Sequence, residues 1–114
     1  MEIRSRYQIM KIGDLRHRIT FQKPIETEDE YLSKTTIWQD VVTVWASVEP
    51  LTGREYFYAH QIKNEVSHRV RIRYRSDLNE KMRIKHLERY FKIESMIDMR
   101  ERHEFLEILC VEEK

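Results

Sequence analysis

The segment Ser67–Arg75, with the sequence SHRVRIRYR, alternates apolar and charged residues with a period of two. Such a period places successive side chains on opposite faces of a β-strand, whereas a helix would distribute the arginines around its circumference. The segment therefore predicts a strand. The face expected to point into the core carries Val66, His68, Val70, Ile72 and Tyr74. The face expected to lie on the exterior carries Arg69, Arg71, Arg73 and Arg75.

Length and composition indicate one domain. A chain of 114 residues can bury a core without disulfides or metal, and Cys110 is its sole cysteine. Charged residues make up 36% of the chain, but the net charge is only +1, so overall electrostatics does not predict nucleic-acid binding. No apolar run approaches the roughly 18 residues needed to cross a bilayer, and the N-terminus lacks a signal-peptide core. We therefore expect a protein that is cytosolic or is assembled in a cytosol.

The first half of the chain predicts two strands with a loop between them. The first runs from about His17 to Lys23 and is expected to end at Pro24, which has no N–H for a ladder hydrogen bond. The segment Glu26–Thr36 contains four acids without periodicity, which predicts a long exposed loop. Trp38–Pro50 is apolar on both faces, which predicts a strand that is covered on both sides or touches another subunit.

The periodicity changes after Pro50 and predicts the one helix of the chain. Thr52 and Glu55 have the spacing of a capping box, followed by a short helix from about Gly53 to Lys63. Three consecutive aromatic residues lie on it: Tyr56, Phe57 and Tyr58. They span most of the circumference, so at least one must point away from the core of this domain. Two interpretations stay open, namely packing over the end of a barrel and an anchor for a neighbouring protein.

Three weaker strands are predicted at about Met82–His86, Tyr90–Met96 and Glu104–Val111, with a tight turn at Leu87–Arg89 between the first two. Five or six short strands exceed what an isolated hairpin can stabilise. The predicted fold is therefore mainly β: a small closed or partly closed barrel of five to six strands, with one short helix and a long loop.

Sequence motifs for catalysis or metal binding are absent. Leu51–Glu55 has one glycine but lacks the lysine and the spacing of a phosphate-binding loop. The five histidines form no HxH or HxxxH pair. His68 belongs to the inward row, and Cys110 alternates with apolar neighbours, so both are expected in the core. We expect no catalytic residue, no metal and no cofactor.

The arginine row has two interpretations that the residues alone leave open. Acids on neighbouring strands, such as Glu94, Glu104 and Glu107, could pair with it, or the charges could protect a sheet edge from aggregation. The row could instead bind a polyanion such as a duplex backbone, which requires spaced positive charge and no base-reading groups.

Several segments, in unbroken order from Met10 to Glu112, resemble one known family. They read IGDLRHRITFQKP, WQDVVTVWASVEPLTGREYFYAHQ, VSHRVRIRYR and MRIKHLERYFKIES…ERHEFLEILCVE. The resemblance is to phage head–tail adaptor proteins, the head-closure or stopper family of tailed siphophages and their prophages. The loop EYLSK and the turn HLER depart from the glycine-containing sequences of that family. Residues 1–9 precede the usual start and are expected to be a flexible extension before a single domain, 10–114.

The resemblance implies a structural protein that is not an enzyme. Such proteins are small β-barrels that assemble as a dodecameric ring beneath the portal and its adaptor. They close the DNA-filled head and offer a docking surface to the tail. The implied partners are further copies of the chain, the portal or adaptor protein above, the tail protein below and, non-specifically, phage DNA. The implied location is the host cytoplasm during assembly and then the virion.

In such a ring we expect three functional surfaces. The arginine row would face a neighbouring subunit or the DNA channel. A partner-docking helix would act through Arg54, Tyr56, Phe57 and Tyr58. A gating or docking loop would act through Glu26, Glu28, Asp29, Glu30 and Tyr31. The alternative function is a stand-alone nucleic-acid-binding barrel that uses the Arg69–Arg75 strand face.

Overall fold

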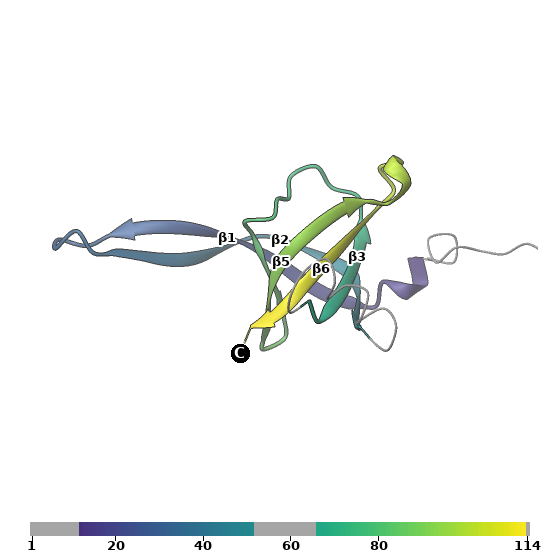
Figure 1. The fold of residues 1–114 in the computed structure, drawn as a ribbon, viewed down its shortest axis with the longest axis horizontal. Helices are drawn as coiled ribbons and strands as arrows, with labels where there is room; N and C mark the ends of the chain where they lie inside the picture. Colours follow the sequence, from purple (N-terminus) through teal and green to yellow (C-terminus); the bar gives the residue numbers. More distant parts are fainter. Residues whose placement is uncertain (1–11, 52–65, 114) are drawn as a thin grey trace, which may run out of the picture.

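The computed structural model describes residues 12–51 and 66–113 of the chain (Figure 1). Two short 3₁₀ turns are η1 (Ile12–Asp14) and η2 (Met99–Glu101). The six strands are β1 (His17–Glu28), β2 (Lys34–Pro50), β3 (His68–Arg73), β4 (Arg83–His86), β5 (Arg89–Asp98) and β6 (Phe105–Glu113). Within these ranges no helix has the length and apolar character needed to span a membrane.

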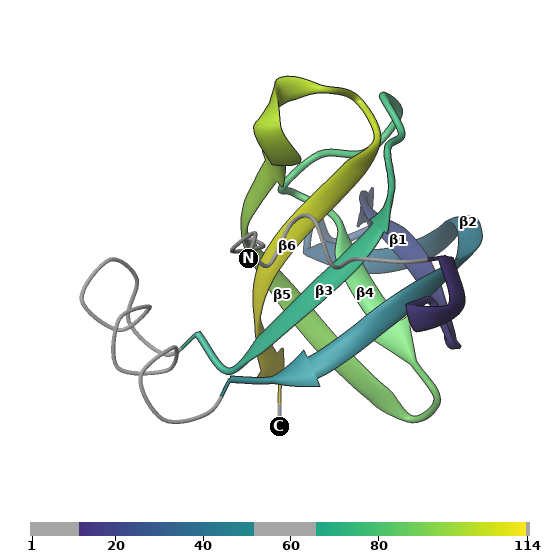
Figure 2. The same ribbon diagram turned by 90° about the vertical axis from the view of Figure 1, so that its right-hand side faces the viewer.

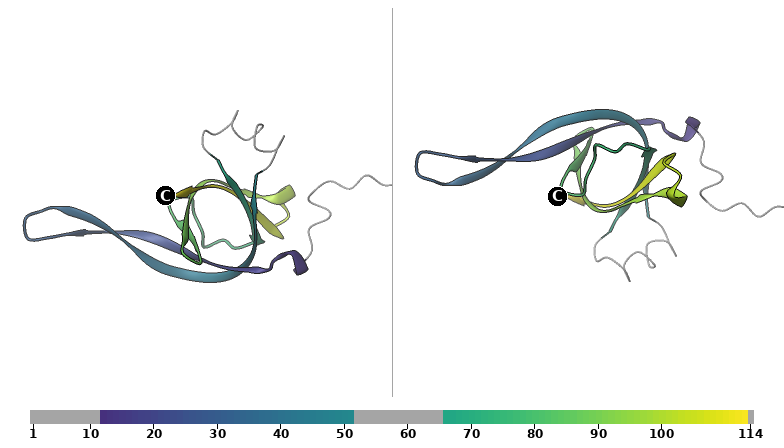
Figure 3. Two further views of the ribbon diagram at one scale, coloured as in Figure 1. Left: turned by 90° about the horizontal axis from the view of Figure 1, so that it is seen from below. Right: turned by 90° about the horizontal axis from the view of Figure 1, so that it is seen from above.

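The six strands, which are labelled in Figure 2, form one antiparallel sheet that closes on itself in the order β1-β2-β3-β6-β5-β4. Views from above and below show the closed ring (Figure 3). Side chains from all six strands fill its interior, and the fully buried ones include Ile19, Phe21, Val70, Ile72, Ile84, Phe91, Ile108 and Cys110. The predicted mainly β, closed six-stranded fold is confirmed.

The strand predicted from SHRVRIRYR is β3, and its inward face is as expected. Val70 and Ile72 are fully buried in the barrel core, His68 is buried and Tyr74 is half-buried. The expectation is wrong for Val66, which precedes β3 and is buried in a separate cluster with Leu51 and Leu109. β3 lies between β2 and β6, with Val70 paired to Val48 on one side and to Ile108 on the other. The predicted turn at Leu87–Arg89 joins β4 to β5, with Leu87 at a φ of 58°.

The prediction of a long loop over Glu26–Thr36 is wrong. β1 continues through Pro24 to Glu28 and stays paired with β2, so this region is a β-hairpin that projects far from the barrel (Figure 1). We call residues 23–39 the arm. Pro24 is tolerated because β1 pairs with β4 only at Thr20–Gln22, and beyond that point one edge of β1 has no described strand beside it.

The tip of the arm is an ordered turn. Asp29 organises it, since its Oδ1 accepts hydrogen bonds from the backbone N–H groups of Tyr31 at 2.8 Å and Ser33 at 2.9 Å. The N–H of Leu32 donates to the Asp29 carbonyl at 3.0 Å, and Leu32 adopts a φ of 63°. An aspartate side chain that bonds the following backbone amides is a common way to stabilise a tight turn.

The helix predicted over Gly53–Lys63, with Arg54, Tyr56, Phe57 and Tyr58, lies outside the described residues, as does the extension 1–9. Both therefore stay predictions.

Candidate functional site

The arginine row on β3 divides into a buried half and an accessible half. Arg69 and Arg71 are only 7% and 5% exposed, whereas Arg73 is exposed and Arg75 is half-buried. The expectation that all four lie open on the exterior is therefore wrong for Arg69 and Arg71. Their position between β2 and β6 is the reason, because side chains from both neighbouring strands can cover a central strand.

The two buried arginines form ion pairs with acids on the flanking strands. An Arg69 guanidinium N–H donates to Glu49 on β2 at 2.8 Å, and Arg71 lies 4.0 Å from Glu107 on β6. In both pairs the two residues are directly opposite each other in the ladder. The cross-strand pairing considered from the sequence is thus present for Glu107. The Glu49 pair was missed, since only the register of β2 against β3 brings it to Arg69.

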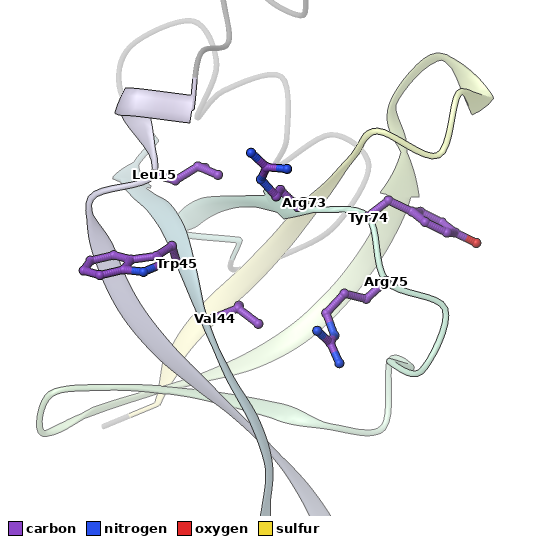
Figure 4. Close-up of a pocket in the computed structure, with 6 residues that line it drawn as sticks. All are labelled: Leu15, Val44, Trp45, Arg73, Tyr74 and Arg75. Atoms are coloured by element: carbon purple, nitrogen blue, oxygen red, sulfur yellow. The ribbon is translucent and has the colours of Figure 1, made fainter.

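The accessible half of the row lines a groove. The groove has a volume of about 650 Å³. It opens at the end of β3, where the chain no longer pairs with β2 (Figure 4). Its lining residues are Leu15, Val44, Trp45, Arg73, Tyr74 and Arg75. We call it the Trp45 groove. Trp45 is 52% exposed, and the Arg18 guanidinium lies 4.9 Å from its ring centroid. The strand pattern alone does not predict this groove, because it combines the residue after η1, two residues of β2, and the end of β3 with the two residues that follow it.

The arm tip gathers the acidic residues predicted for the loop. Glu26, Glu28 and Glu30 are exposed and make no ion pair with the described residues. Beside them, Tyr31 and Leu32 are 80% and 74% exposed. A tip with free carboxylates and two large apolar side chains is suited to binding a surface that is both apolar and basic.

A stacked arginine joins the arm to the barrel. The Arg83 guanidinium of β4 lies 4.3 Å from the ring centroid of Trp38 in the arm and 4.1 Å from that of Tyr90 on β5. Its Nε also donates to Gln22 Oε1 at 2.8 Å, and the Gln22 amide donates to Asp40 at 2.8 Å. Cation–π contacts on both faces fix the base of the arm against β4 and β5.

His68 is a hydrogen-bonded core residue, as expected. Arg89 can only donate, so its hydrogen bond of 3.1 Å makes His68 Nε2 the acceptor and leaves the proton on Nδ1, which donates to Ser67 Oγ at 2.8 Å. Arg89 also donates twice to Glu112 at 2.9 Å. Burial and the Arg89 charge lower the pKa of His68 below its ordinary 6.5, and Glu112 opposes this shift. The imidazole is therefore neutral.

Cys110 is fully buried, and burial raises the pKa of its thiol to about 12. It is thus a core residue, as expected. Within residues 12–51 and 66–113, no three His, Cys, Asp or Glu side chains come together in a way that could hold a metal ion.

The features above describe a small closed barrel that presents an acidic arm on one side and an aromatic, basic groove on another. Exposed aromatic and charged surfaces of this kind are suited to contacts with other proteins. A family model described as phage head completion protein matches residues 10–113. The chain belongs to this family and is a structural protein of a phage virion, which confirms the resemblance found in the sequence.

Individual relatives agree with this assignment. The chain is 32% identical over 66 residues to head completion protein gp16 of Bacillus phage SPP1, a match that covers 58% of this chain and 61% of the relative. The chain thus spans about three fifths of the length of the curated relative it matches.

Two solved structures share the fold. The solution structure of protein SF1141 from Shigella flexneri 2a superposes with a TM-score of 0.69 at 35% identity, covering 90% of this chain and 96% of that one. A chain from the virion of a native gene transfer agent particle superposes with a TM-score of 0.59 at 14% identity, covering 84% and 92%. The second likeness concerns the fold alone.

Proposed function

We propose that the chain is a head–tail joining protein that assembles as a dodecameric ring beneath the phage portal and its adaptor. The ring closes the DNA-filled head and docks the tail, and it acts through contacts, without catalysis and without a cofactor. The family match over residues 10–113 carries this proposal. The protein is made and assembled in the host cytoplasm and ends in the head–tail connector of the virion.

The arm is the gating or docking element of this proposal. It replaces the loop that the sequence predicted, and it presents Glu26, Glu28, Asp29, Glu30 and Tyr31 at or near its tip. Carboxylates without ion pairs are repelled by DNA phosphates, so the tip is better suited to contacting protein than to resting on DNA. An arm fixed at its base by Arg83 can reach a neighbour while the barrel keeps its own place.

The arginine row contributes through its accessible half. Arg73 and Arg75 face a neighbouring subunit or the DNA channel, and in the second arrangement they make the non-specific contact with phage DNA. Repetition around a ring multiplies a modest charge per chain into a strong local potential. The helix predicted from the sequence, with Arg54, Tyr56, Phe57 and Tyr58, is our candidate for a contact to the portal or tail protein.

A stand-alone DNA-binding barrel is less well supported. That function needs spaced, accessible cations along β3, but Arg69 and Arg71 are buried and paired with Glu49 and Glu107. A gel-shift titration of the full chain against duplex DNA at low and high salt separates the two functions. Submicromolar, salt-sensitive binding that depends on Arg73 would favour the stand-alone barrel.

Deletion of the gene from its phage tests the proposal directly. We expect heads that package DNA but lose it and lack tails, with tail joining restored when the full chain is supplied from a plasmid. A variant with residues 29–33 replaced by Asn-Gly keeps the barrel and is expected to restore neither DNA retention nor tail joining. Electron microscopy of complemented particles should show the chain as a ring at the head–tail vertex. Normal tailed particles after deletion would refute the proposal.

A further inference from the structure

The arm tip and the Trp45 groove have complementary surfaces. We propose that the arm tip of one copy binds in the Trp45 groove of a neighbouring copy. This inference rests on the proposed ring and names the contact between its subunits. The two surfaces occur in every copy, so the same contact can repeat around the assembly.

The groove offers an apolar floor with cations at its rim. Leu15 and Val44 point into the groove, and the rings of Trp45 and Tyr74 project away from it on opposite sides (Figure 4). An accessible tryptophan beside an apolar recess is a typical hot spot of a protein interface. Among the described residues Arg73 has no ion pair, so its guanidinium is available to a carboxylate from outside the domain.

Two further arginines lie near the groove, and they differ in whether they already pair with a carboxylate. Arg18 stacks on Trp45 and is exposed, without an ion pair among the described residues. Arg75 already donates two hydrogen bonds to Asp77, at 3.0 and 2.9 Å. Among the lining residues the uncompensated positive charge is therefore that of Arg73, and Arg18 adds a second cation beside Trp45.

The tip carries the matching groups in one compact turn. Tyr31 and Leu32 have no core to enter, and the carboxylates of Glu28 and Glu30 make no ion pair with described residues. Seating the two apolar side chains in the groove would bring these carboxylates to its arginine rim. The Asp29 hydrogen bonds order the turn beforehand, which reduces the entropy lost on binding.

The geometry requires two different copies. Figures 1 and 3 show the arm leaving the barrel on the side opposite to η1, the turn that immediately precedes Leu15. A tip therefore cannot reach the groove of its own chain. A contact between different patches on two copies is head-to-tail, and such contacts close into rings when the rotation between subunits allows it.

Disulfide trapping between two variants of the full chain, each with one introduced cysteine, tests this contact. Leu32→Cys places a thiol at the tip and Val44→Cys places one in the groove, while the native Cys110 is fully buried. We expect a mixed disulfide when the two variants are combined at high concentration and oxidised mildly. Pairing Leu32→Cys with Leu87→Cys is the control, because Leu87 is 73% exposed but lies outside the groove.

Charge reversal then identifies the ionic part of the contact. Arg73→Glu and Glu30→Arg are each expected to lower the yield of the disulfide by about tenfold, because each places like charges together. The double reversal should recover much of the yield. Lys81→Glu, an exposed residue outside this groove, is the matched control and should change nothing.

The same cysteine variants are then examined in assembled particles. Equal yields for the tip–groove and control pairs, or a groove cysteine that links only to a different virion protein, would overturn the proposed contact. A ring seen at the head–tail vertex without the tip–groove disulfide would overturn this contact and leave the head–tail role intact. Tailed particles that form after gene deletion would refute the head–tail role independently of the disulfide result.

Discussion

The barrel and the arm are made from the same two strands but are stabilised by different interactions. Within the barrel, Ile19 and Phe21 of β1 are fully buried in the shared core. A few residues further along the same hairpin, Ile25 is only half-buried and its partner Ile37 is 50% exposed. A two-stranded ribbon without a core is marginal alone. The arm therefore depends on the barrel for its order and can be altered at its tip without loss of the fold.

The largest effect is expected from a core substitution. Phe91 is fully buried, and its ring meets that of His68 edge-on at a centroid distance of 4.9 Å. Phe91→Ala should lower the free energy of unfolding by about 3–5 kcal/mol, measured by chemical denaturation. Tyr31→Ala at the arm tip is the matched aromatic control and should change stability by less than about 0.5 kcal/mol. Similar losses for both variants would contradict the separation of barrel and arm.

A smaller loss is expected at the buried ion pair between β3 and β6. Glu107→Gln removes the negative charge beside Arg71 and should cost roughly 1–3 kcal/mol of unfolding free energy, because the buried guanidinium loses a nearby opposite charge. Glu104→Gln changes an exposed acid next to the same strand and should have almost no effect. If Glu107→Gln were as neutral as its control, the arginine would not contribute to barrel stability through this pair.

The junction between barrel and arm should respond locally. Arg83→Ala removes the stack between Trp38 and Tyr90 and should lower the unfolding free energy by about 1 kcal/mol. Amide hydrogen exchange in residues 23–39 should accelerate more than exchange in the barrel, because local opening of the arm becomes easier. Arg18→Ala, which removes the stack on Trp45, should leave arm exchange unchanged. Equal acceleration throughout the chain would show that Arg83 stabilises the barrel and not the junction.

The smallest effect is expected from acidification. The pKa of His68 is lowered in the folded state, so between that value and 6.5 the unfolded chain binds more protons. The contribution of His68 to the free energy of unfolding is thus fully present above about pH 6.5, and it decreases as the pH falls through this window. Glu112 limits the loss because it favours the protonated imidazole. The variant His68→Asn should flatten this part of the pH profile of the melting temperature, and an unchanged profile would assign the effect to other groups.

The local periodicity of the sequence was sufficient to predict the strands of the barrel but not the paired strands of the arm. Where one face of a strand is buried and the other meets solvent, the alternation is visible, as in β3. Both faces of the arm are largely polar and exposed, so Ile25 and Ile37 do not stand out from their neighbours. Pro24 also suggested a strand end, although an unpaired edge accepts proline. The Arg83 stack was not predicted because Trp38 is far from Arg83 in sequence, and Tyr90 is brought back to Arg83 only by the pairing of β4 with β5.

The sequence by itself determined the family, the mainly β fold and the face of β3 on which each side chain lies. Each of these depends on residue order or on a two-residue period, which are properties of the chain alone. Only the tertiary structure decided whether the outward arginines reach solvent. That outcome depends on the neighbours: β2 and β6 place Glu49 and Glu107 beside Arg69 and Arg71, whereas Arg73 lies at the end of β3, where the chain leaves β2 and a groove opens.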